Sequence, residues 1–400
     1  MSTLPTLRFV NADILGGGRE LCVRDGAIVA SADDGEVIDC GGKLLAPAIV
    51  DLGVFAVDRA AFRAGGIARV GLMPDQAPPL DHPGLVQRAG LIGKPDLWIH
   101  PLAAATRGLE GRELAEIASC VQAGARAIST GRNWIADSGV MRRVLSYACD
   151  LDLTVVVHAE DAGLTGGAVA TDGEIATRLG LASAPASAEA LAIARDLILA
   201  EDIGARLHFR QVTTAAGFDL VRRAKARGVA VTCGVTPAHW LLSETAIGDF
   251  RTFTRLSPPL RSEDDRRATS AAIGDGTIDV LCSGHDPRGP EAKRLPFADA
   301  EPGMAGAETL LPLTLGLVRD GVVDLPRLFE LLSANPARLL GLDGGTLAHG
   351  APADVMIVDS EAPWVIDGEK LLARAGNTPF DGLPVQGRVR RLFKGGREVL

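Results

Sequence analysis

The chain has 400 residues, a length that suits one large α/β barrel with a small satellite domain, or two to three ordinary domains. Hydrophobic residues make up 47% and charged residues 23%, a balance that excludes a largely disordered chain. The 41 basic and 50 acidic residues give a net charge of −9, which argues against nucleic acid and against an anionic membrane as the main partner.

Six cysteines are scattered along the chain without a C-x-x-C pair, which indicates free thiols in a reducing compartment. The first ten residues lack a basic region followed by a long apolar run. No stretch approaches the ~18 consecutive apolar residues of a membrane span. We therefore expect a cytoplasmic protein that has no membrane partner.

The first residues predict short β-strands. Three β-prone segments, at 7–14, 20–23 and 27–30, are separated by turns containing Gly and Asp, and a fourth follows at 37–45. The apolar run at 46–51 then predicts a buried strand.

Strands and helices alternate through the middle of the chain. Roughly eight such units favour a TIM-type (β/α)8 barrel, because repeated β-then-α units build parallel sheets with helical crossovers. We expect strands at 67–73, 97–101, 127–129, 153–158, 206–212, 229–235 and 278–283, and helices at 85–90, 111–123, 139–149, 187–199, 216–226, 307–319 and 326–332.

The last part of the chain returns to short strands, at 354–358, 364–366 and 389–393. We expect both chain ends to form one small β-sandwich domain beside the barrel. The predicted boundaries are residues 1–46 and 343–400 for the β domain and 47–342 for the barrel. The polar loop at 286–305 is the best candidate for a mobile lid.

Several segments resemble the dihydroorotase and hydantoinase branch of the amidohydrolase superfamily, in the same order along nearly the whole chain. They are LAPAIVDL at 45–52, AGGI at 64–67, MPD at 73–75, TRGLEG at 106–111, VHAED at 157–161, VTPAH at 235–239, SPPLR at 257–261 and GNTPF at 376–380. The resemblance implies a barrel enzyme that hydrolyses cyclic amides with zinc held at the C-terminal ends of the strands.

The family pattern requires H-x-H after the first barrel strand, and Gly53 and Phe55 stand at those two positions. It requires a metal-bridging carboxylate where Thr130 and Gly131 stand. Neither Gly nor Phe offers a lone pair, so the resemblance implies that these metal ligands are missing.

Two later histidines complete the family's metal site. His158 matches the first of them, but Gln211 stands at the second, and His208 is expected to face the helical layer because its strand parity is opposite to that of Gln211. The aspartate that binds metal and acts as general acid and base is replaced by Gly284.

The residues that would contact the substrate also depart from the family pattern. Val57 stands where the family has an arginine, and Asp75 replaces the asparagine of M-P-N. With one retained ligand, His158, we expect no metal cofactor and no catalysis. This pattern of losses resembles the inactive dihydroorotase-like subunit of some bacterial aspartate carbamoyltransferases. The resemblance implies a homodimer that binds the carbamoyltransferase catalytic chain in pyrimidine biosynthesis.

Two other functions stay open: a metal-dependent cyclic amidohydrolase with a remodelled site, and a sensor that binds a small molecule without turnover. A new single-metal site could combine His158 with Cys282 and Asp286. His239 and His285 are expected to make structural hydrogen bonds. Trp134 is expected above the barrel mouth, as a plug or as a contact surface.

Overall fold

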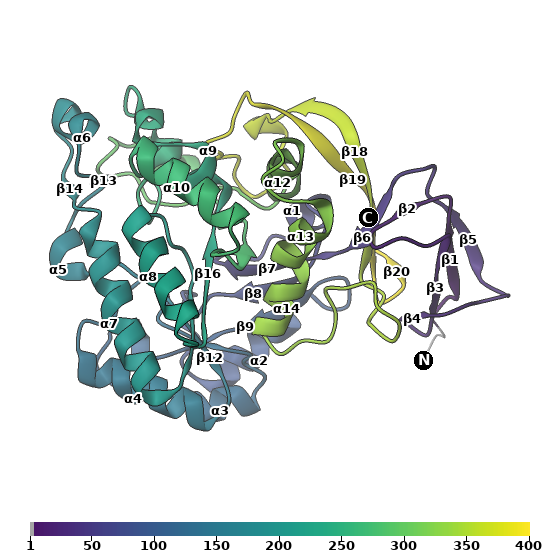
Figure 1. Ribbon diagram of the computed structural model, residues 1–400, viewed down its shortest axis with the longest axis horizontal. Coiled ribbons are helices and arrows are strands. Elements are labelled where there is room, and N and C mark those ends of the chain that lie inside the picture. Colours follow the sequence, from purple (N-terminus) through teal and green to yellow (C-terminus); the bar gives the residue numbers. More distant parts are fainter. Residues whose placement is uncertain (1–3) are drawn as a thin grey trace.

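The computed structural model describes residues 4–400 and shows a (β/α)8 barrel beside a small β domain that contains both chain ends (Figure 1). Parallel pairing links the barrel strands in chain order. They are β7 (Ile49–Val54), β8 (Ile67–Leu72), β9 (Trp98–Pro101) with its continuation β10 (Ala103–Ala104), β11 (Ile128–Ser129), β12 (Thr154–Val157), β15 (Arg206–Phe209), β16 (Val231–Val235) and β17 (Val280–Leu281).

The first and last barrel strands are joined by hydrogen bonds rather than by a regular ladder. The Phe55 backbone N–H donates to the His285 carbonyl at 3.0 Å, and the Ser283 backbone N–H donates to the Asp51 carboxylate at 2.9 Å. Burial raises the pKa of Asp51 to about 6, although hydrogen bonds from Ser283 act in the opposite direction.

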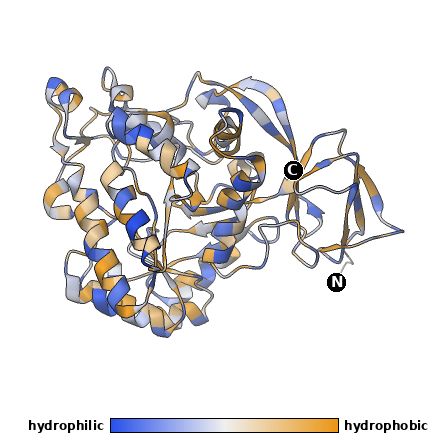
Figure 2. Cartoon of the chain, in the orientation of Figure 1, coloured by the Kyte–Doolittle hydropathy of each residue, from blue (hydrophilic) through white to orange (hydrophobic). Residues whose placement is uncertain are grey.

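Helices surround the strands, and their two-sided character is visible in Figure 2, where hydrophobic and hydrophilic residues share the same helices. Inside the barrel, residues such as Val50, Leu52 and Val156 form one apolar cluster, and a larger cluster lies between strands and helices. The helices are α1 (Arg59–Ala64), α2 (Pro83–Leu91), α3 (Ile117–Gln122), α4 (Ser138–Asp150), α7 (Ser187–Ile203), α8 (Ala215–Ala226), α10 (Glu263–Gly274), α12 (Leu310–Arg319), α13 (Leu325–Phe329) and α14 (Asn335–Leu339).

Shorter helices and strands lie in the loops that follow the barrel strands. They are α5 (Ala162–Thr165), β13 (Ala170–Thr171), α6 (Glu174–Leu179), β14 (Ser183–Ala184), α9 (Pro237–Leu241) and α11 (Pro290–Lys293). No helix within residues 4–400 is both long enough and apolar enough to cross a membrane.

Two sheets face each other in the small domain, so the predicted β-sandwich is confirmed. Their shared core includes Phe9 from one sheet and Phe393 from the other, whose rings meet edge to face at 4.9 Å. One sheet has the order β4–β3–β1–β5 and the other β2–β6–β18–β19–β20. The bounds are β1 (Leu7–Val10), β2 (Asp13–Ile14), β3 (Glu20–Arg24), β4 (Ala27–Val29), β5 (Glu36–Asp39), β6 (Leu44–Pro47), β18 (Val355–Val365), β19 (Pro384–Lys394) and β20 (Arg397–Glu398).

Three local predictions need correction. The strand expected at 7–14 is interrupted at Asn11, whose φ of 51° is left-handed. The helix expected at 111–123 begins only at Ile117, because Gly111 adopts a φ of 74° and the chain up to Glu116 forms a loop. The strand expected at 364–366 is instead the second half of the long strand β18. The domain boundaries at 46/47 and 342/343 stay a prediction.

The loop at 286–305 is anchored, which argues against the mobile lid expected there. The buried ammonium of Lys293 donates to the backbone carbonyls of Thr252, Arg255 and Glu301 at 2.7–3.2 Å. Burial lowers the pKa of Lys293 to about 8. Moving this loop away would break the hydrogen bonds of Lys293 to Thr252 and Arg255, which lie outside the loop.

Candidate functional site

The side chain at the centre of the barrel mouth belongs to Arg210, which follows the last residue of β15. In the strand register His208 lies beside Val156 on one side and Thr232 on the other. Val156 belongs to the interior cluster, so His208 also faces the interior, and the prediction that it faces the helices is wrong. The same alternation directs Arg210 into the barrel mouth.

Arg210 passes across the place where the first predicted metal ligand is missing. A Cβ atom at Gly53 would lie 3.5 Å from Cγ and 3.6 Å from Cδ of Arg210. Gly53 has a φ of 92°, a conformation that side-chain-bearing residues rarely adopt. The aliphatic part of Arg210 therefore packs directly against the position that a side chain at residue 53 would occupy.

Phe55 stands at the second missing ligand, and two cations lie close to its ring. The guanidinium carbon of Arg132 is 3.7 Å from the ring centre and that of Arg210 is 5.1 Å away. Such contacts stabilise a cation through the negative face of the ring. The H-x-H position thus carries a cation-binding aromatic surface instead of metal ligands.

His158 is the retained ligand position, and both of its ring nitrogens are engaged. Nδ1 lies 3.1 Å from Arg210 Nη2 and Nε2 lies 3.2 Å from Glu160 Oε2. A guanidinium can only donate, so Nδ1 accepts, and Nε2 carries the proton that it donates to Glu160. No lone pair of His158 is left for a metal.

Gln211 continues the hydrogen-bond chain that Arg210 begins. Arg210 Nη1 donates to Gln211 Oε1 at 2.6 Å, and Gln211 Nε2 donates to Thr236 Oγ1 at 3.2 Å. The Thr236 hydroxyl donates to His239 Nδ1 at 3.0 Å, and His239 Nε2 donates to the Pro258 carbonyl at 3.2 Å. Burial lowers the pKa of His239 to about 4. The structural role predicted for His239 is confirmed.

The remaining predicted ligand positions are glycines in left-handed backbone. Gly131 has a φ of 71°, and a Cβ there would lie 2.7 Å from Asp75 Oδ1. Gly284 has a φ of 59°, and a Cβ there would lie 2.8 Å from Thr236 Cγ2. Beside Gly131, the Thr130 hydroxyl accepts a hydrogen bond from the His158 backbone N–H at 3.2 Å. Neighbouring atoms already occupy the space of the lost carboxylates.

The expected substrate-contact positions are also integrated into the protein. Val57 is half-buried and packs against the apolar layer between strands and helices. Asp75 accepts a hydrogen bond from the Arg132 backbone N–H at 2.9 Å. The Arg132 side chain pairs with Asp286 at 2.5 Å, and Arg288 pairs with the same carboxylate at 3.0 Å.

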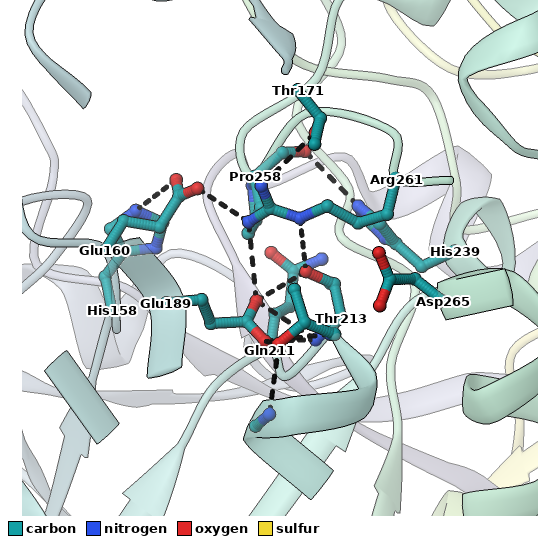
Figure 3. A network of polar contacts seen from close by, with 12 residues as sticks. His158, Glu160, Thr171, Glu189, Gln211, Thr213, His239, Pro258, Arg261 and Asp265 are labelled. Carbon is teal, nitrogen blue, oxygen red and sulfur yellow. Dashed lines mark hydrogen bonds and ion pairs between the residues drawn. The ribbon is translucent and has the colours of Figure 1, made fainter. Parts of the chain in front are cut away.

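A buried ionic network continues from His158 through Glu160 to Arg261 and Glu189 (Figure 3). Arg261 pairs with Glu160 at 2.7 Å and with Glu189 at 3.4 Å. Glu189, from α7, also accepts hydrogen bonds from the backbone N–H groups of Thr213 and Thr214, each at 2.9 Å. The network holds the His158–Glu160 pair in one orientation.

The alternative metal site of His158, Cys282 and Asp286 is not formed. Burial raises the pKa of the Cys282 thiol to about 12, and its sulfur lies 3.6 Å from the Val235 carbonyl. Asp286 is already neutralised by two arginines. Within residues 4–400, no three His, Cys, Asp or Glu side chains are grouped to hold a metal ion. The residues present at the family's metal position therefore do not fit a metal.

Two neighbouring spaces that share lining residues remain at the barrel mouth. The inner cavity, beside Arg210 and Gln211, measures about 30 Å³. The outer pocket measures about 460 Å³ and is lined by His158, Glu160 and Trp134 among others. Arg132 lines both spaces, and the outer one is large enough for a small ligand. Trp134 stacks under Arg195 at 3.9 Å and forms part of the pocket wall.

Sequence reasoning missed Arg210, Arg132, Arg261 and Glu189. The alternation of side chains along β15 was the available signal for Arg210. His208 pairs with the interior residue Val156, so the residue two positions after His208 also faces the interior. His285 was expected to make structural hydrogen bonds, and its Nδ1 accepts one from the Ala307 backbone N–H at 3.2 Å.

The Glu160 carboxylate makes stability depend on pH. Burial alone would raise the pKa of Glu160, but the hydrogen bond from His158 and the charge of Arg261 outweigh it and lower the pKa to about 2. The stabilisation is therefore complete above pH ~4.5 and is lost as the pH falls toward 2. We predict that Glu160→Gln lowers the free energy of unfolding by about 3–5 kcal/mol at pH 7 and by progressively less below pH ~4.5.

Urea titrations at several pH values measure this difference between the two proteins. The matched control is Glu113→Gln, which removes an exposed partner of Arg107 and should change stability by at most about 1 kcal/mol at pH 7. An unchanged difference between wild type and Glu160→Gln from pH 7 to pH 3 would contradict the assignment of a buried, ionised Glu160.

Comparisons with known proteins agree with this fold. The family model described as "Dihydro-orotase-like" matches residues 42–216. A dihydroorotase from Syntrophotalea carbinolica is 38% identical over 89% of this chain and 87% of its own, and one from Desulforapulum autotrophicum is 36% identical over 98% of both chains. The L-hydantoinase from Arthrobacter aurescens superposes with a TM-score of 0.87 at 25% identity, covering 99% of this chain and 96% of its own.

These relatives overturn the expectation that the chain is not an enzyme. The similar sequences are named dihydroorotase, and the similar structures are hydantoinases and dihydropyrimidinases, which are cyclic amidohydrolases. The family is metal-dependent. This chain therefore differs from its family in the side chains at the barrel mouth, although its sequence and fold are those of the family.

The segments LAPAIVDL, VHAED and SPPLR lie on the barrel strands and loops that build the site, and identity to the dihydroorotases extends over nine-tenths of the chain. The chain belongs to the dihydroorotase-like family of amidohydrolases.

Proposed function

We propose that this chain is a dihydroorotase-type cyclic amidohydrolase of pyrimidine biosynthesis whose remodelled site uses guanidinium groups where its family uses metal. The observation that supports the proposal is Arg210, a buried cation whose stem crosses the place of the first missing ligand and whose head binds the retained His158. The relatives named dihydroorotase support the substrate class, a cyclic amide that bears a carboxylate.

The outer pocket provides the binding surface for such a ligand. Arg132 and Arg255 bring positive charge to its lining, and Trp134 brings an aromatic face. Arginine forks suit carboxylates because they donate two parallel hydrogen bonds. A ring-opened ureido acid and its cyclic amide both carry the carboxylate that these groups would bind.

The chemistry available to these residues is electrostatic. Burial lowers the pKa of Arg210 only to about 10, so the guanidinium stays charged at neutral pH and can stabilise negative charge that develops on a reacting oxygen. Position 284 offers no carboxylate for proton transfer, and both nitrogens of His158 and of His239 are engaged in hydrogen bonds. Proton transfer would have to use solvent, so we expect turnover to be slow.

Turnover measured in the presence of a chelator tests this function. We predict that hydrolysis of dihydroorotate, and cyclisation of carbamoyl aspartate, are insensitive to chelators. They should be slower than in the Syntrophotalea carbinolica dihydroorotase by at least about 10²–10⁴-fold, the usual contribution of a general acid–base group. Arg132→Met should weaken substrate binding, whereas Arg107→Met, which removes an exposed arginine, should not.

Loss of activity on chelation, with recovery on adding zinc, would contradict the guanidinium-based site. A rate that does not exceed the uncatalysed one, in protein shown to be folded, would contradict the enzymatic proposal altogether.

We propose in addition that the chain forms a homodimer and binds the catalytic chain of aspartate carbamoyltransferase. The observation that favours a protein contact is the outer face of α7, where Leu191 and Ile198 lie seven residues apart with 52% and 67% of their surface exposed. Two turns of helix bring such residues to the same face. Tyr147 on the neighbouring helix α4 is exposed as well.

Light scattering of the purified chain, alone and mixed with the carbamoyltransferase catalytic chain, tests this assembly. We predict a dimer alone, a larger complex in the mixture, and loss of the complex in the double variant Leu191→Glu/Ile198→Glu. Val365→Glu, an exposed apolar residue on β18, is the control and should leave both assemblies intact. A mixture at micromolar concentrations that scatters light as the sum of the two separate chains would refute the partnership.

A further inference from the structure

The inner cavity of the barrel mouth contains a buried positive charge without an anionic partner. Arg210 is only 3% exposed. Its guanidinium contacts two neutral acceptors, His158 Nδ1 and Gln211 Oε1. Within residues 4–400 it forms no direct ion pair, the carboxylates of Asp75 and Glu160 act on it only at longer range, and its Nε–H group has no hydrogen-bond partner. Other buried arginines of this protein, such as Arg261 and Arg69, each pair with a carboxylate.

An uncompensated buried charge is costly, since burial removes the solvation that water gives an exposed guanidinium. The guanidinium of Arg132 also lies near the Phe55 ring, and the repulsion between the two cations adds to this cost. Asp286 lines the same cavity, but it is already shared by Arg132 and Arg288. The one carboxylate among the residues lining the cavity therefore has two other arginine partners, and Arg210 has no carboxylate in direct contact.

The cavity has the size of a small anion. Its volume of about 30 Å³ has room for roughly two water-sized groups, such as the two oxygens of a carboxylate. Its lining includes three residues whose side chains carry hydrogen-bond donors, Arg210, Arg132 and Ser257.

We propose that the cavity beside Arg210 is an anion-binding site that takes one carboxylate group. Two sources carry the same chemistry: a free small carboxylate, or the carboxylate of a larger ligand whose body lies in the adjoining outer pocket. The two spaces share Arg132, Leu256, Ser257 and Pro302, so a ligand can span them. The site rests on Arg210 and its surroundings, and it does not require that the protein turns over any substrate.

Calorimetric titration with sodium formate tests the site. We expect the wild-type protein to bind one formate with a Kd on the order of a few millimolar. Arg210→Met, which keeps the volume of the stem and removes the charge, should weaken formate binding by at least tenfold. Arg223→Met removes an exposed arginine on α8 and should bind formate like the wild type.

Thermal denaturation provides the second readout, because a ligand that binds only the folded state raises the Tm. Formate should raise the Tm of the wild type and of Arg223→Met but not that of Arg210→Met. If Arg210→Met does not fold, Arg210→Lys takes its place. It keeps the charge but loses the fork, and should bind formate several-fold more weakly. Formate binding that is equal in wild type and in a folded Arg210 variant, or absent from the wild type, would overturn the proposal.

Competition separates the two sources of the carboxylate. Carbamoyl aspartate that displaces formate identifies a ligand carboxylate in the cavity, and carbamoyl aspartate that binds alongside formate identifies a free small anion. Formate binding that depends on Arg210 in a protein without dihydroorotase turnover would leave this site standing while contradicting the proposed activity.

Discussion

The guanidinium of Arg210 sets the hydrogen bonding of the whole barrel mouth. Because it only donates, it obliges Nδ1 of His158 and Oε1 of Gln211 to accept. This fixes which group donates in the hydrogen bonds that follow: Thr236 donates to His239, and His158 donates to Glu160. One buried cation thus determines the protonated nitrogen of two histidines and the orientation of an amide. A metal ion in the same place would have required the opposite arrangement, with lone pairs directed inward.

The surroundings are adapted to this cation and not to a metal. Gly53 leaves room for the stem of Arg210, and the ring of Phe55 offers its face to the charge. At Gly131 and Gly284, left-handed backbone and close neighbours leave no room for carboxylates. At these two positions both the residue type and the surrounding atoms are unsuited to a metal-binding carboxylate. The barrel strands and helices, in contrast, follow the general physical requirements of a (β/α)8 barrel.

The architecture could be predicted from the sequence because hydrophobic alternation and turn residues report on local structure. The barrel strands, the helix at 187–199 and the sandwich formed by both chain ends all followed from such patterns. The helix expected from residue 111 failed because a glycine with a positive φ interrupts a stretch whose composition suits a helix. Where a helix begins depends in such a case on backbone angles that the amino-acid composition does not specify.

The site was predicted less completely. Comparing positions with a family motif identifies what is missing, such as the histidines at Gly53 and Phe55, but does not show what fills the space. Arg210 comes from β15, Arg132 from the loop after β11 and Glu189 from a helix, and only the closed barrel brings them together. His208 was assigned to the wrong face because Gln211 was taken as the interior position, whereas alternation from Val156 places Arg210 there.

The most direct test of the central claim, that a guanidinium takes the place of the metal, is the metal content of the folded protein. Protein produced in zinc-supplemented medium and freed of loosely bound ions should contain far less than one zinc ion per chain, and zinc should not raise its Tm. One or more tightly bound ions per chain, released only together with a loss of folded structure or activity, would contradict the account.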